Sequence, residues 1–171
     1  MSKHLQKNIV SASKLVSESN VELSEVEFGL IIASNAFNRW TERCMIASGS
    51  NALNTTDILV IHNINHRNRP KRVTDICFTL NIEDTHQVGY ALRKLAKLDL
   101  IRGEKSGKEM FYSLTAAGKK LCEKYREVRE QCLVDAFEDM GISHAELGKL
   151  ARTLRTISGS YDQAARAATS L

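Results

Sequence analysis

The sequence predicts a mainly α-helical protein with one small β-hairpin, folded as a winged helix-turn-helix between helical extensions. Two short apolar helices at residues 73–80 and 85–98, separated by a tight break, indicate the helix-turn-helix. Two short strands around a Ser-Gly turn follow directly and indicate the wing. We therefore expect a winged helix-turn-helix domain at residues 53–115. The flanking N-terminal helices at 1–52 and C-terminal helices at 116–171 are expected to form a dimer.

The composition of the 171-residue chain narrows the class of protein. Hydrophobic residues make up 43% of it and proline occurs once, which favours a folded helical protein over a disordered or collagen-like one. No run approaches about 18 apolar residues, so we expect no membrane-spanning helix. Residues 1–16 lack the continuous apolar core of a secretion signal. These observations predict a cytoplasmic protein without a membrane partner.

The cysteines predict neither a metal site nor a cofactor. They show no C-x-x-C pairing and no histidine at zinc-ligand spacing. Each has apolar or helical neighbours, among which a free cysteine behaves as a small hydrophobic residue. A redox sensor is the alternative reading, but no neighbouring residue clearly activates a thiol. We expect structural thiols at Cys44, Cys77, Cys122 and Cys132.

Capping signals and apolar spacing predict the N-terminal helices. Residues 2–19 contain scattered apolar residues and indicate a short helix only weakly. Ser24 with Glu27 three residues later forms a capping box, which predicts the start of a helix that ends at Gly49. Its expected buried face is formed by Val26, Leu30, Ala33, Phe37, Trp40 and Cys44.

The winged helix-turn-helix domain begins with a helix and a basic loop. Asn54 or Thr55 is the expected cap of the helix, and Asp57 lies in its first turn, where the helix dipole favours an acidic residue. The loop at residues 66–72 is rich in arginine and contains the only proline of the chain. It either contacts phosphate groups or is a solvated linker, and the sequence favours neither reading.

Apolar spacing assigns an inner and an outer face to the next two helices. The inner face is formed by Val73, Ile76, Cys77 and Leu80 in the first helix and by Val88, Ala91, Leu92, Leu95 and Leu98 in the second. Ile82, in the break, is expected to pack under both helices. The outer face of the second helix, called here the reader helix, carries Thr85, His86, Gln87, Gly89, Tyr90, Arg93, Lys94 and Lys97.

The wing is predicted at residues 101–104 and 110–114, two short strands around a turn at 105–108. Together with the reader helix it lies in the most basic part of the chain. Residues 66–108 contain ten Lys and Arg but five Asp and Glu, a net charge of +5, which leaves −1 elsewhere because the total is +4. Attraction to nucleic-acid phosphates requires a basic excess at such a place.

Two further helices are expected after the wing. Thr115 is the predicted cap of a long helix that ends at Gly141. Ser143 opens a second capping box, and the helix that follows is expected to end at Gly159. Residues 161–171 are then a tail of small residues.

The phrases VTDI at residues 73–76, LAKLDLIR at 95–102 and LTAAG at 114–118, in this order, resemble the MarR family of winged-helix regulators. The resemblance is close over about residues 53–121 and architectural elsewhere. It implies a homodimer built from the N- and C-terminal helices that usually represses genes. Many members of the family release DNA on binding a small phenolic or amphipathic ligand, or on cysteine oxidation.

The chain departs from the family pattern at three places. Ala96 stands where the family favours Glu, and Asp99 where it favours Gly, although Asp tolerates the left-handed backbone of such a turn. The family's wing commonly carries an Asp-x-Arg pair whose Arg enters the minor groove, whereas residues 104–109 read EKSGKE here. Lysine lacks the planar fork of arginine and fits a narrow groove less well, so Lys105 and Lys108 are expected at phosphates.

These observations predict a sequence-specific, DNA-binding transcription regulator that binds a pseudo-palindromic operator as a homodimer. The side chains expected near base edges are Thr85, His86, Gln87 and Tyr90, of which the Gln87 amide suits adenine. Those expected at phosphates are Arg93, Lys94, Lys97, Lys105 and Lys108. The resemblance also implies a small-molecule effector, whose pocket Trp40, His62 and His66 would line. Ordinary core or surface residues are the alternative for these three.

A second reading, from a different class, is a winged helix that serves as a protein-interaction module with weak or no DNA binding. The lysine-only wing and the acidic pair Glu83 and Asp84 at the start of the reader helix favour this reading, and the net charge of +5 opposes it. The sequence does not predict an enzyme, because it contains no G-x-S-x-G, H-E-x-x-H or P-loop phrase.

Overall fold

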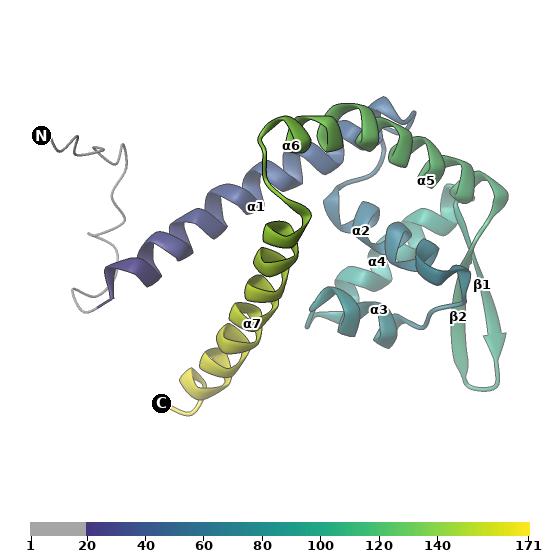
Figure 1. Cartoon of the computed structure of the whole chain (residues 1–171). Coiled ribbons are helices and arrows are strands. Elements are labelled where there is room, and N and C mark those ends of the chain that lie inside the picture. Colours follow the sequence, from purple (N-terminus) through teal and green to yellow (C-terminus); the bar gives the residue numbers. More distant parts are fainter. Residues whose placement is uncertain (1–19) are drawn as a thin grey trace, which may run out of the picture. The chain divides into compact units, whose positions relative to one another are not determined.

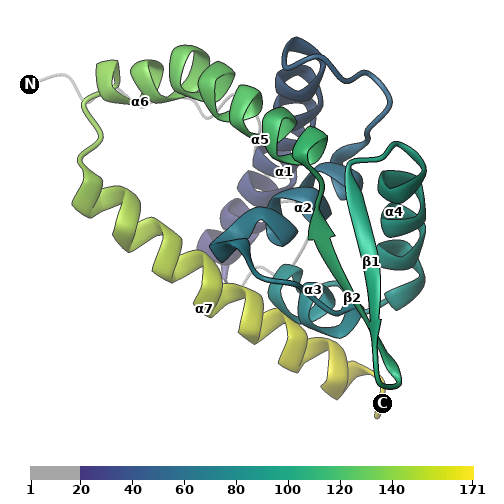
Figure 2. The same cartoon turned by 90° about the vertical axis from the view of Figure 1, so that its right-hand side faces the viewer.

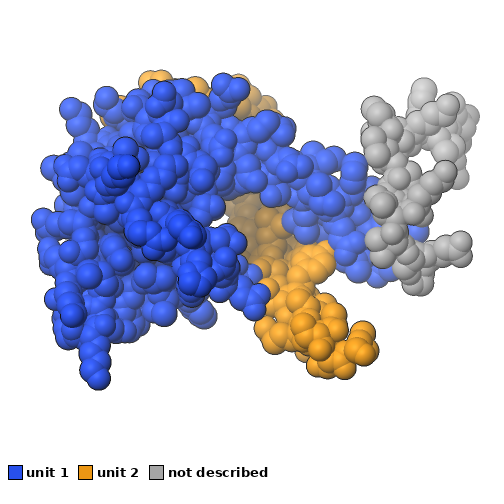
Figure 3. All heavy atoms as spheres, turned by 180° about the vertical axis from the view of Figure 1, so that it is seen from behind, with its two compact units in different colours: residues 1–125 blue, residues 126–171 orange. Residues whose placement is uncertain are grey.

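The structure is a computed structural model that describes residues 20–171, except for the side chains of Asn68 and Glu138. Helices dominate, and one antiparallel hairpin is the only sheet among the described residues (Figure 1). The chain divides into two compact units, residues 1–125 and 126–171 (Figure 3). The short helix expected within residues 2–19 lies outside the described part. Within that part, no helix is long and apolar enough to cross a lipid bilayer.

Helix α1 spans Val21–Ala47 and begins before the predicted start at Ser24. Asn20 precedes it, and the side-chain oxygen of Asn20 accepts a hydrogen bond from the Leu23 amide at 3.1 Å. An asparagine in this position satisfies one of the free amides of the first turn. The capping box predicted at Ser24 and Glu27 is therefore wrong as a helix start, because a cap is available upstream.

The apolar face predicted for α1 is buried only toward its C-terminal end. Thr41, Cys44 and Met45 are buried, whereas Val26, Ala33 and Phe37 of the predicted face are exposed. The prediction of a buried face is thus wrong for these three residues. The helical spacing is present, but the first unit covers this face only along the last turns of α1.

Helix α2 spans Thr55–Asn65 and begins with the predicted cap. The Asn54 side-chain oxygen accepts a hydrogen bond from the Asp57 amide, and the Asp57 carboxylate accepts one from the Asn54 amide, both at 3.0 Å. Its apolar residues Ile58, Val60, Ile61 and Ile64 are buried in the core of the first unit. A short 3-10 turn, η2, follows at His66–Asn68.

Helices α3 (Val73–Leu80) and α4 (Thr85–Lys97) form the predicted helix-turn-helix, and both pack against α2 (Figure 1). Asn81 ends α3 in the left-handed conformation, with φ 53°, which asparagine adopts more readily than most residues. As predicted, the buried inner face of α4 consists of Val88, Ala91, Leu92 and Leu95. Leu98 was expected on this face but is 41% exposed, because α4 ends before it and Leu98 is the C-terminal cap.

The wing consists of the antiparallel strands β1 (Ile101–Ser106) and β2 (Glu109–Leu114), which extend from the body of the first unit in Figure 2. Both strands are longer than predicted, because the connection between them needs only Gly107 and Lys108. Gly107 has φ 62° and takes the first central position, where a type II′ hairpin turn favours glycine. The predicted four-residue turn is corrected to a two-residue one.

The base of the wing joins α4 to helix α5 (Ala116–Arg129). Asp99 has φ 56°, the left-handed conformation expected at this position. Thr115 caps α5 as predicted, since its hydroxyl accepts a hydrogen bond from the Gly118 amide at 3.1 Å and donates one to the Asp99 carbonyl at 2.6 Å. The α-carbon of Gly118 faces the Leu100 carbonyl so closely that any side chain would overlap that oxygen. The Thr of the LTAAG phrase thus caps α5, and the Gly leaves room for the Leu100 carbonyl.

The second unit begins within α5 and contains η3 (Glu130–Val134), a π-helical turn, followed by α6 (Asp135–Asp139). The predicted helix is therefore not a regular α-helix up to Gly141, because η3 interrupts it. Gly141 itself is in the left-handed conformation, with φ 69°, and stands at the predicted stop.

Helix α7 spans His144–Ala168 and forms most of the second unit. The predicted capping box is present: the Glu146 amide donates to the Ser143 hydroxyl at 3.3 Å, and the Ser143 amide donates to the Glu146 carboxylate at 2.9 Å. The helix continues through Gly159, so the predicted C-terminal tail is wrong. Several alanines follow that glycine, and alanine is the strongest helix former.

Candidate nucleic-acid interface

The outer face of α4, the reader helix, is polar and largely open to solvent. Its exposed side chains are Thr85, His86, Gln87, Tyr90, Arg93 and Lys97. They are exposed because the apolar stripe holds the opposite side of α4 against the core. Asp84 caps the helix by accepting a hydrogen bond from the His86 amide at 2.9 Å. The result is a helix surface with side-chain donors and acceptors, of a width that the major groove of duplex DNA admits.

Arg93 and Tyr90 form a pair on this surface. The Arg93 guanidinium lies over the Tyr90 ring, 4.4 Å from its centroid. Such a cation–π contact at an exposed site contributes roughly 0.5–1 kcal/mol. The contact restricts the rotation of both side chains, so two of the predicted contact residues are held in one arrangement.

Lys94 differs from the other cations of the reader helix. Its ammonium nitrogen is 2.6 Å from the Asp57 carboxylate, which belongs to α2 and is only 4% exposed. Lys94 itself is half-buried. The structure therefore directs this side chain toward α2, whereas Arg93 and Lys97 point to solvent.

Both acidic side chains of the wing are paired with arginine. The two acidic residues are paired as Glu104 with Arg102, at 3.1 Å, and Glu109 with Arg72, at 3.0 Å. Lys105 and Lys108 are exposed, and neither has a carboxylate partner among the described residues. The tip of the hairpin is therefore effectively cationic, despite the acidic residues in its sequence.

Arg72 attaches the tip of the wing to the start of α3. Its guanidinium donates to both oxygens of Glu109, at 3.0 and 3.2 Å, and to both oxygens of Asp75, at 2.9 and 3.1 Å. The hydrogen bonds from Arg72 hold the pKa of Asp75 below its ordinary value, and those to Asp75 and Glu109 raise the pKa of Arg72. The neighbouring residue, Lys71, pairs with Tyr112 of β2 through backbone hydrogen bonds of 3.0 and 2.8 Å. The wing is thus joined to the helix-turn-helix at two points.

Acidic residues lie beside the N-terminal end of the reader helix. An open depression there is lined by Asn81, Ile82, Glu83, Asp84 and Gln87. Gln87, expected at a base edge, shares this depression with two carboxylates. Carboxylates repel phosphate but accept hydrogen bonds from base amino groups such as that of cytosine. This end of α4 therefore suits contacts to bases better than contacts to the DNA backbone.

The three residues expected around an effector pocket differ in their surroundings. Trp40 of α1 is half-buried, and so is His62 of α2, whose ring centroid is 4.4 Å from that of Tyr125. Burial lowers the pKa of His62, and its Nε2 atom has no hydrogen-bond partner within the described part of the chain. His66 is exposed and lies beyond the end of α2, so the two histidines do not share one helical face.

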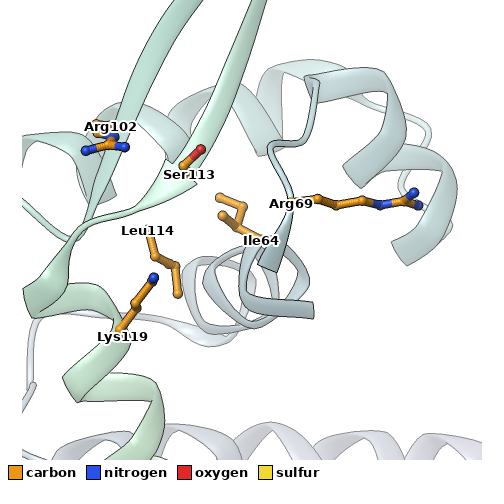
Figure 4. A pocket seen from close by; sticks show the side chains of 6 residues that line it. All are labelled: Ile64, Arg69, Arg102, Ser113, Leu114 and Lys119. Atoms are coloured by element: carbon orange, nitrogen blue, oxygen red, sulfur yellow. The ribbon is translucent and has the colours of Figure 1, made fainter. Parts of the chain in front are cut away.

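A cavity of about 170 Å³ lies between α2, the base of the wing and the start of α5. It is lined by Ile64, Arg69, Arg102, Ser113, Leu114 and Lys119. Figure 4 shows that its cationic side chains point in different directions, with Arg69 directed away from the others. They therefore do not converge on one point, as the ligands of a single anion would.

The second unit contains a separate, mainly apolar pocket of about 260 Å³. It is lined by Arg129, Leu133, Val134, Phe137, Ile142, His144 and Leu147. The helical spacing did not predict it, because part of its wall is formed by the π-helical turn η3, a rare interruption of a regular helix.

Phe78 of α3 is an exposed residue that the sequence analysis does not single out. It is 90% exposed, whereas its neighbours Ile76 and Cys77 are buried. Its position off the apolar stripe of α3 is the signal that would have revealed it. An exposed aromatic side chain on the first helix of a helix-turn-helix is suited to an apolar contact, such as that with a thymine methyl group.

Three of the four cysteines are buried, and the fourth is exposed in η3. Burial raises the pKa of the Cys122 thiol to about 11 and also raises that of Cys77. The Cys44 thiol donates to the Tyr125 carbonyl oxygen at 3.6 Å. These three behave as small core residues, and Cys132 is the accessible one.

Comparisons with known proteins agree with this geometry. Residues 53–118 match the family described as winged helix DNA-binding domain. The fold is similar to that of Staphylococcus aureus MarR in complex with salicylate and kanamycin, with a TM-score of 0.65 and 18% identity over 90% of this chain and 99% of that chain. It is also similar to a MarR family regulator from Neisseria meningitidis, with a TM-score of 0.67 and 16% identity over 83% and 94%.

A third similar structure is reduced AbfR bound to DNA, a protein of Staphylococcus epidermidis, with a TM-score of 0.63 and 18% identity over 79% of this chain and 93% of that chain. A search of curated proteins found no match. The matched domain covers the helix-turn-helix, the wing and the start of α5, and the structural likeness extends over most of the chain. The chain contains a winged helix DNA-binding domain and has the fold of the MarR family of transcription regulators.

Proposed function

We propose that this protein is a sequence-specific transcription regulator that binds duplex DNA as a homodimer in the cytoplasm. The observation that supports this most strongly is the exposed polar face of α4 within a domain that matches winged helix DNA-binding domains. Reduced AbfR, a protein of similar fold, is bound to DNA. Of the cations predicted at phosphates, Arg93, Lys97, Lys105 and Lys108 are exposed and lack carboxylate partners among the described residues.

Within this proposal the contact residues divide into two groups. Thr85, His86, Gln87 and Tyr90 lie on the N-terminal half of the reader helix and are assigned to base edges. The exposed cations follow on the C-terminal half of α4 and on the wing, and they are assigned to phosphates, which fix the position of the protein without reading sequence. The acidic residues beside Gln87 support this division, because they disfavour phosphate at that end.

We further propose that α1 and α7 form the homodimer, with residues 1–52 and 116–171 as dimerisation segments and 53–115 as the DNA-binding domain. Large apolar side chains on α1 are exposed in the single chain, namely Val21, Leu23, Val26, Ile31, Ile32 and Phe37. Helix α7 similarly exposes Leu150, Leu154 and Tyr161. Apolar surface of this extent is typical of a protein interface.

A small-molecule effector that releases the DNA is part of the proposal. Its support is that Staphylococcus aureus MarR, of similar fold, is in complex with salicylate and kanamycin. We propose that an effector pocket is lined by Trp40, His62 and His66. Of these, His62 has the strongest support, because its ring packs against Tyr125 and its buried Nε2 atom has no hydrogen-bond partner among the described residues.

Selection of an operator from random duplex DNA tests the proposed function. We expect a pseudo-palindromic site with half-sites about 10 bp apart, or a multiple of that, and a complex that contains two chains by mass. Substituting Gln87→Ala and Tyr90→Ala is expected to relax the sequence preference. The control Lys149→Ala, exposed on α7 and outside the DNA-binding domain, should leave the sequence preference unchanged. Failure to enrich any site would contradict the proposal, and unchanged operator binding would remove these two residues from base recognition.

The second candidate function is a protein-interaction module with little DNA affinity. The acidic residues at the start of α4, together with the lack of an unpaired arginine on the wing, favour this candidate. A salt titration of binding to random duplex DNA separates the two functions. Affinity that falls steeply with salt supports the regulator, and no measurable binding at low salt supports the interaction module.

A further inference from the structure

Lys94 is held at the N-terminus of α2 by a geometry that none of the other reader-helix cations share. Its ammonium is 2.6 Å from Asp57 Oδ2, and the same oxygen accepts a hydrogen bond from the Asn54 amide at 3.0 Å. Asp57 is almost fully buried, with its side chain 4% exposed. A buried carboxylate is costly unless it is paired and hydrogen-bonded, so Asp57 strongly favours keeping Lys94 in place.

The N-terminus of α2 is also held from the side of α1. One oxygen of the Glu42 carboxylate accepts two hydrogen bonds from Thr55, one from its amide and one from its hydroxyl, both at 3.0 Å. Thr55 is the first residue of α2 and lies next to the cap, Asn54. A continuous series of polar contacts therefore runs from α1 through the start of α2 to the reader helix.

We propose that Lys94 is a positioning residue that fixes the rotation of the reader helix, and that it does not contact DNA phosphate. Asp57 is its anchor, and Glu42 ties that anchor to α1. This inference rests on the proposed function, in which α4 reads DNA. It also replaces the expectation from the sequence that Lys94 contacts phosphate.

Lys94 can fix the rotation of the reader helix because its polar contact is directional, whereas the apolar contacts of the helix are not. The buried stripe of Val88, Ala91, Leu92 and Leu95 determines which side of α4 faces the core. Apolar contacts are not directional, however, and allow small rotations and shifts. A charge-assisted hydrogen bond has a defined length and angle, so the contact of Lys94 with Asp57 selects one of these rotations. Side chains that read base edges depend on that selection, whereas phosphate contacts by flexible lysines tolerate small shifts.

Lys97 is the matched control, because it lies one turn further along the same helix, is exposed and has no carboxylate partner among the described residues. We would measure binding of the full-length Lys94→Met and Lys97→Met proteins to the selected operator and to random duplex DNA at several salt concentrations. Lys97→Met is expected to weaken binding to both duplexes alike and to reduce the salt slope by about one. Lys94→Met is expected to leave the slope unchanged and to weaken operator binding roughly tenfold more than random binding, the scale of one lost base contact. If Lys94→Met instead behaves as Lys97→Met does, the proposal is wrong.

A double-mutant cycle with Asp57→Asn separates positioning from general loss of folding. The asparagine keeps an oxygen that can accept the Asn54 amide but removes the charge that holds Lys94. Asp57→Asn is expected to reduce operator discrimination as much as Lys94→Met, and the double substitution is expected to add nothing further. Additive losses would overturn the proposal.

Hydrogen exchange in the absence of DNA distinguishes failure of this inference from failure of the proposed function. Backbone amides of α4 are expected to exchange faster in Lys94→Met than in Lys97→Met. On the other side of the anchor, Glu42→Ala is expected to accelerate the same amides, whereas Glu42→Gln, which keeps an acceptor oxygen, is expected to have little effect. Equal exchange in the two lysine variants would overturn the proposal even if DNA binding is confirmed. A wild-type protein that binds no DNA would refute the proposed function alone.

Discussion

The reader helix and the wing belong to the same domain but are stabilised by different interactions. Helix α4 is held by four side chains that are at most 2% exposed and by the pairing of Lys94 with the buried Asp57, so its position depends on contacts that are largely shielded from solvent. The strands of the wing are buried only where they leave the domain, at Ile101 and Leu114, and their remaining residues are exposed or half-buried. Further out, the wing depends on its own backbone hydrogen bonds, on the Lys71–Tyr112 pairing and on Arg72.

The two halves of the proposed interface should therefore respond to different solution conditions. Apolar burial changes little with salt, whereas exposed ion pairs are screened by it. The reader helix should therefore keep one orientation over a wide range of solution conditions, and the wing should respond to them. Three substitutions and a change of pH test this difference.

The largest effect on stability is expected from a substitution that creates a cavity under the reader helix. Leu95 is fully buried, and Leu95→Ala should lower the free energy of unfolding by about 2–5 kcal/mol. Met110 on the wing is a side chain of similar size that is 42% exposed, and Met110→Ala should cost about 0.5 kcal/mol or less. Urea denaturation of the two variants measures the contrast. Similar losses would show that the wing is as tightly packed as the helix.

Substitution of a glycine at the base of the wing should give the next largest loss of stability. Gly118→Ala places a methyl group against the Leu100 carbonyl oxygen, so the backbone must shift, at a cost of roughly 1–3 kcal/mol or more. Gly89 in α4 is the control, because the nearest atom to an added methyl group is the end of the Arg93 side chain, at 3.6 Å. Gly89→Ala should stabilise the protein by about 0.5–1 kcal/mol. Thermal unfolding of both variants tests the prediction, and a neutral Gly118→Ala would contradict it.

At the tip, loss of Arg72 should loosen the wing without unfolding the domain. Arg72→Ala removes the hydrogen bonds to Glu109 and Asp75, so amides of β1 and β2 should exchange faster while those of α4 stay protected. Arg102→Ala breaks a salt bridge within one strand and should leave exchange in the wing nearly unchanged. Hydrogen exchange followed by mass spectrometry measures both. Faster exchange in α4 would show that the wing and the helix are not independent.

The smallest effect on the wing is expected when the pH is lowered. The Arg72 hydrogen bonds hold the pKa of Asp75 below its ordinary value of 3.8. The stabilisation from this pair is therefore complete above pH 3.8 and is lost as the pH falls through the lower, folded-state pKa. Backbone chemical shifts of β2 should move in this range in the wild-type protein. In Asp75→Asn the shift associated with this pair should be absent, and an unchanged titration would show that Asp75 does not hold the wing.

The reader helix was predictable because its signals are local. The apolar stripe of α4 follows from spacing alone, and the caps at Asn54 and Ser143 follow from short phrases. The left-handed turn at Asp99 was also expected, because few residue types other than glycine tolerate it. Patterns of this kind involve residues within one or two turns of each other, which the sequence displays directly.

The contacts that position the candidate interface were not predictable in the same way. Lys94 meets Asp57, and Arg72 meets Glu109, and each pair is separated by 37 residues in the chain. Spacing identified Lys94 as an outward cation but carried no information about a buried carboxylate on another helix. The apolar face of α1 shows the same limit: periodicity indicates that such a face exists, but it does not indicate what covers it.

Because only one of the four cysteines is exposed, the folded protein can be labelled at a single site. A thiol-reactive fluorophore should attach first at Cys132, because that thiol is exposed, while the three buried thiols react only after local opening. The slow phases of such a reaction would then report opening rates at α1, α3 and α5 separately, through Cys44, Cys77 and Cys122. The native sequence thus contains its own probes for local opening of α1, α3 and α5, without any introduced cysteine.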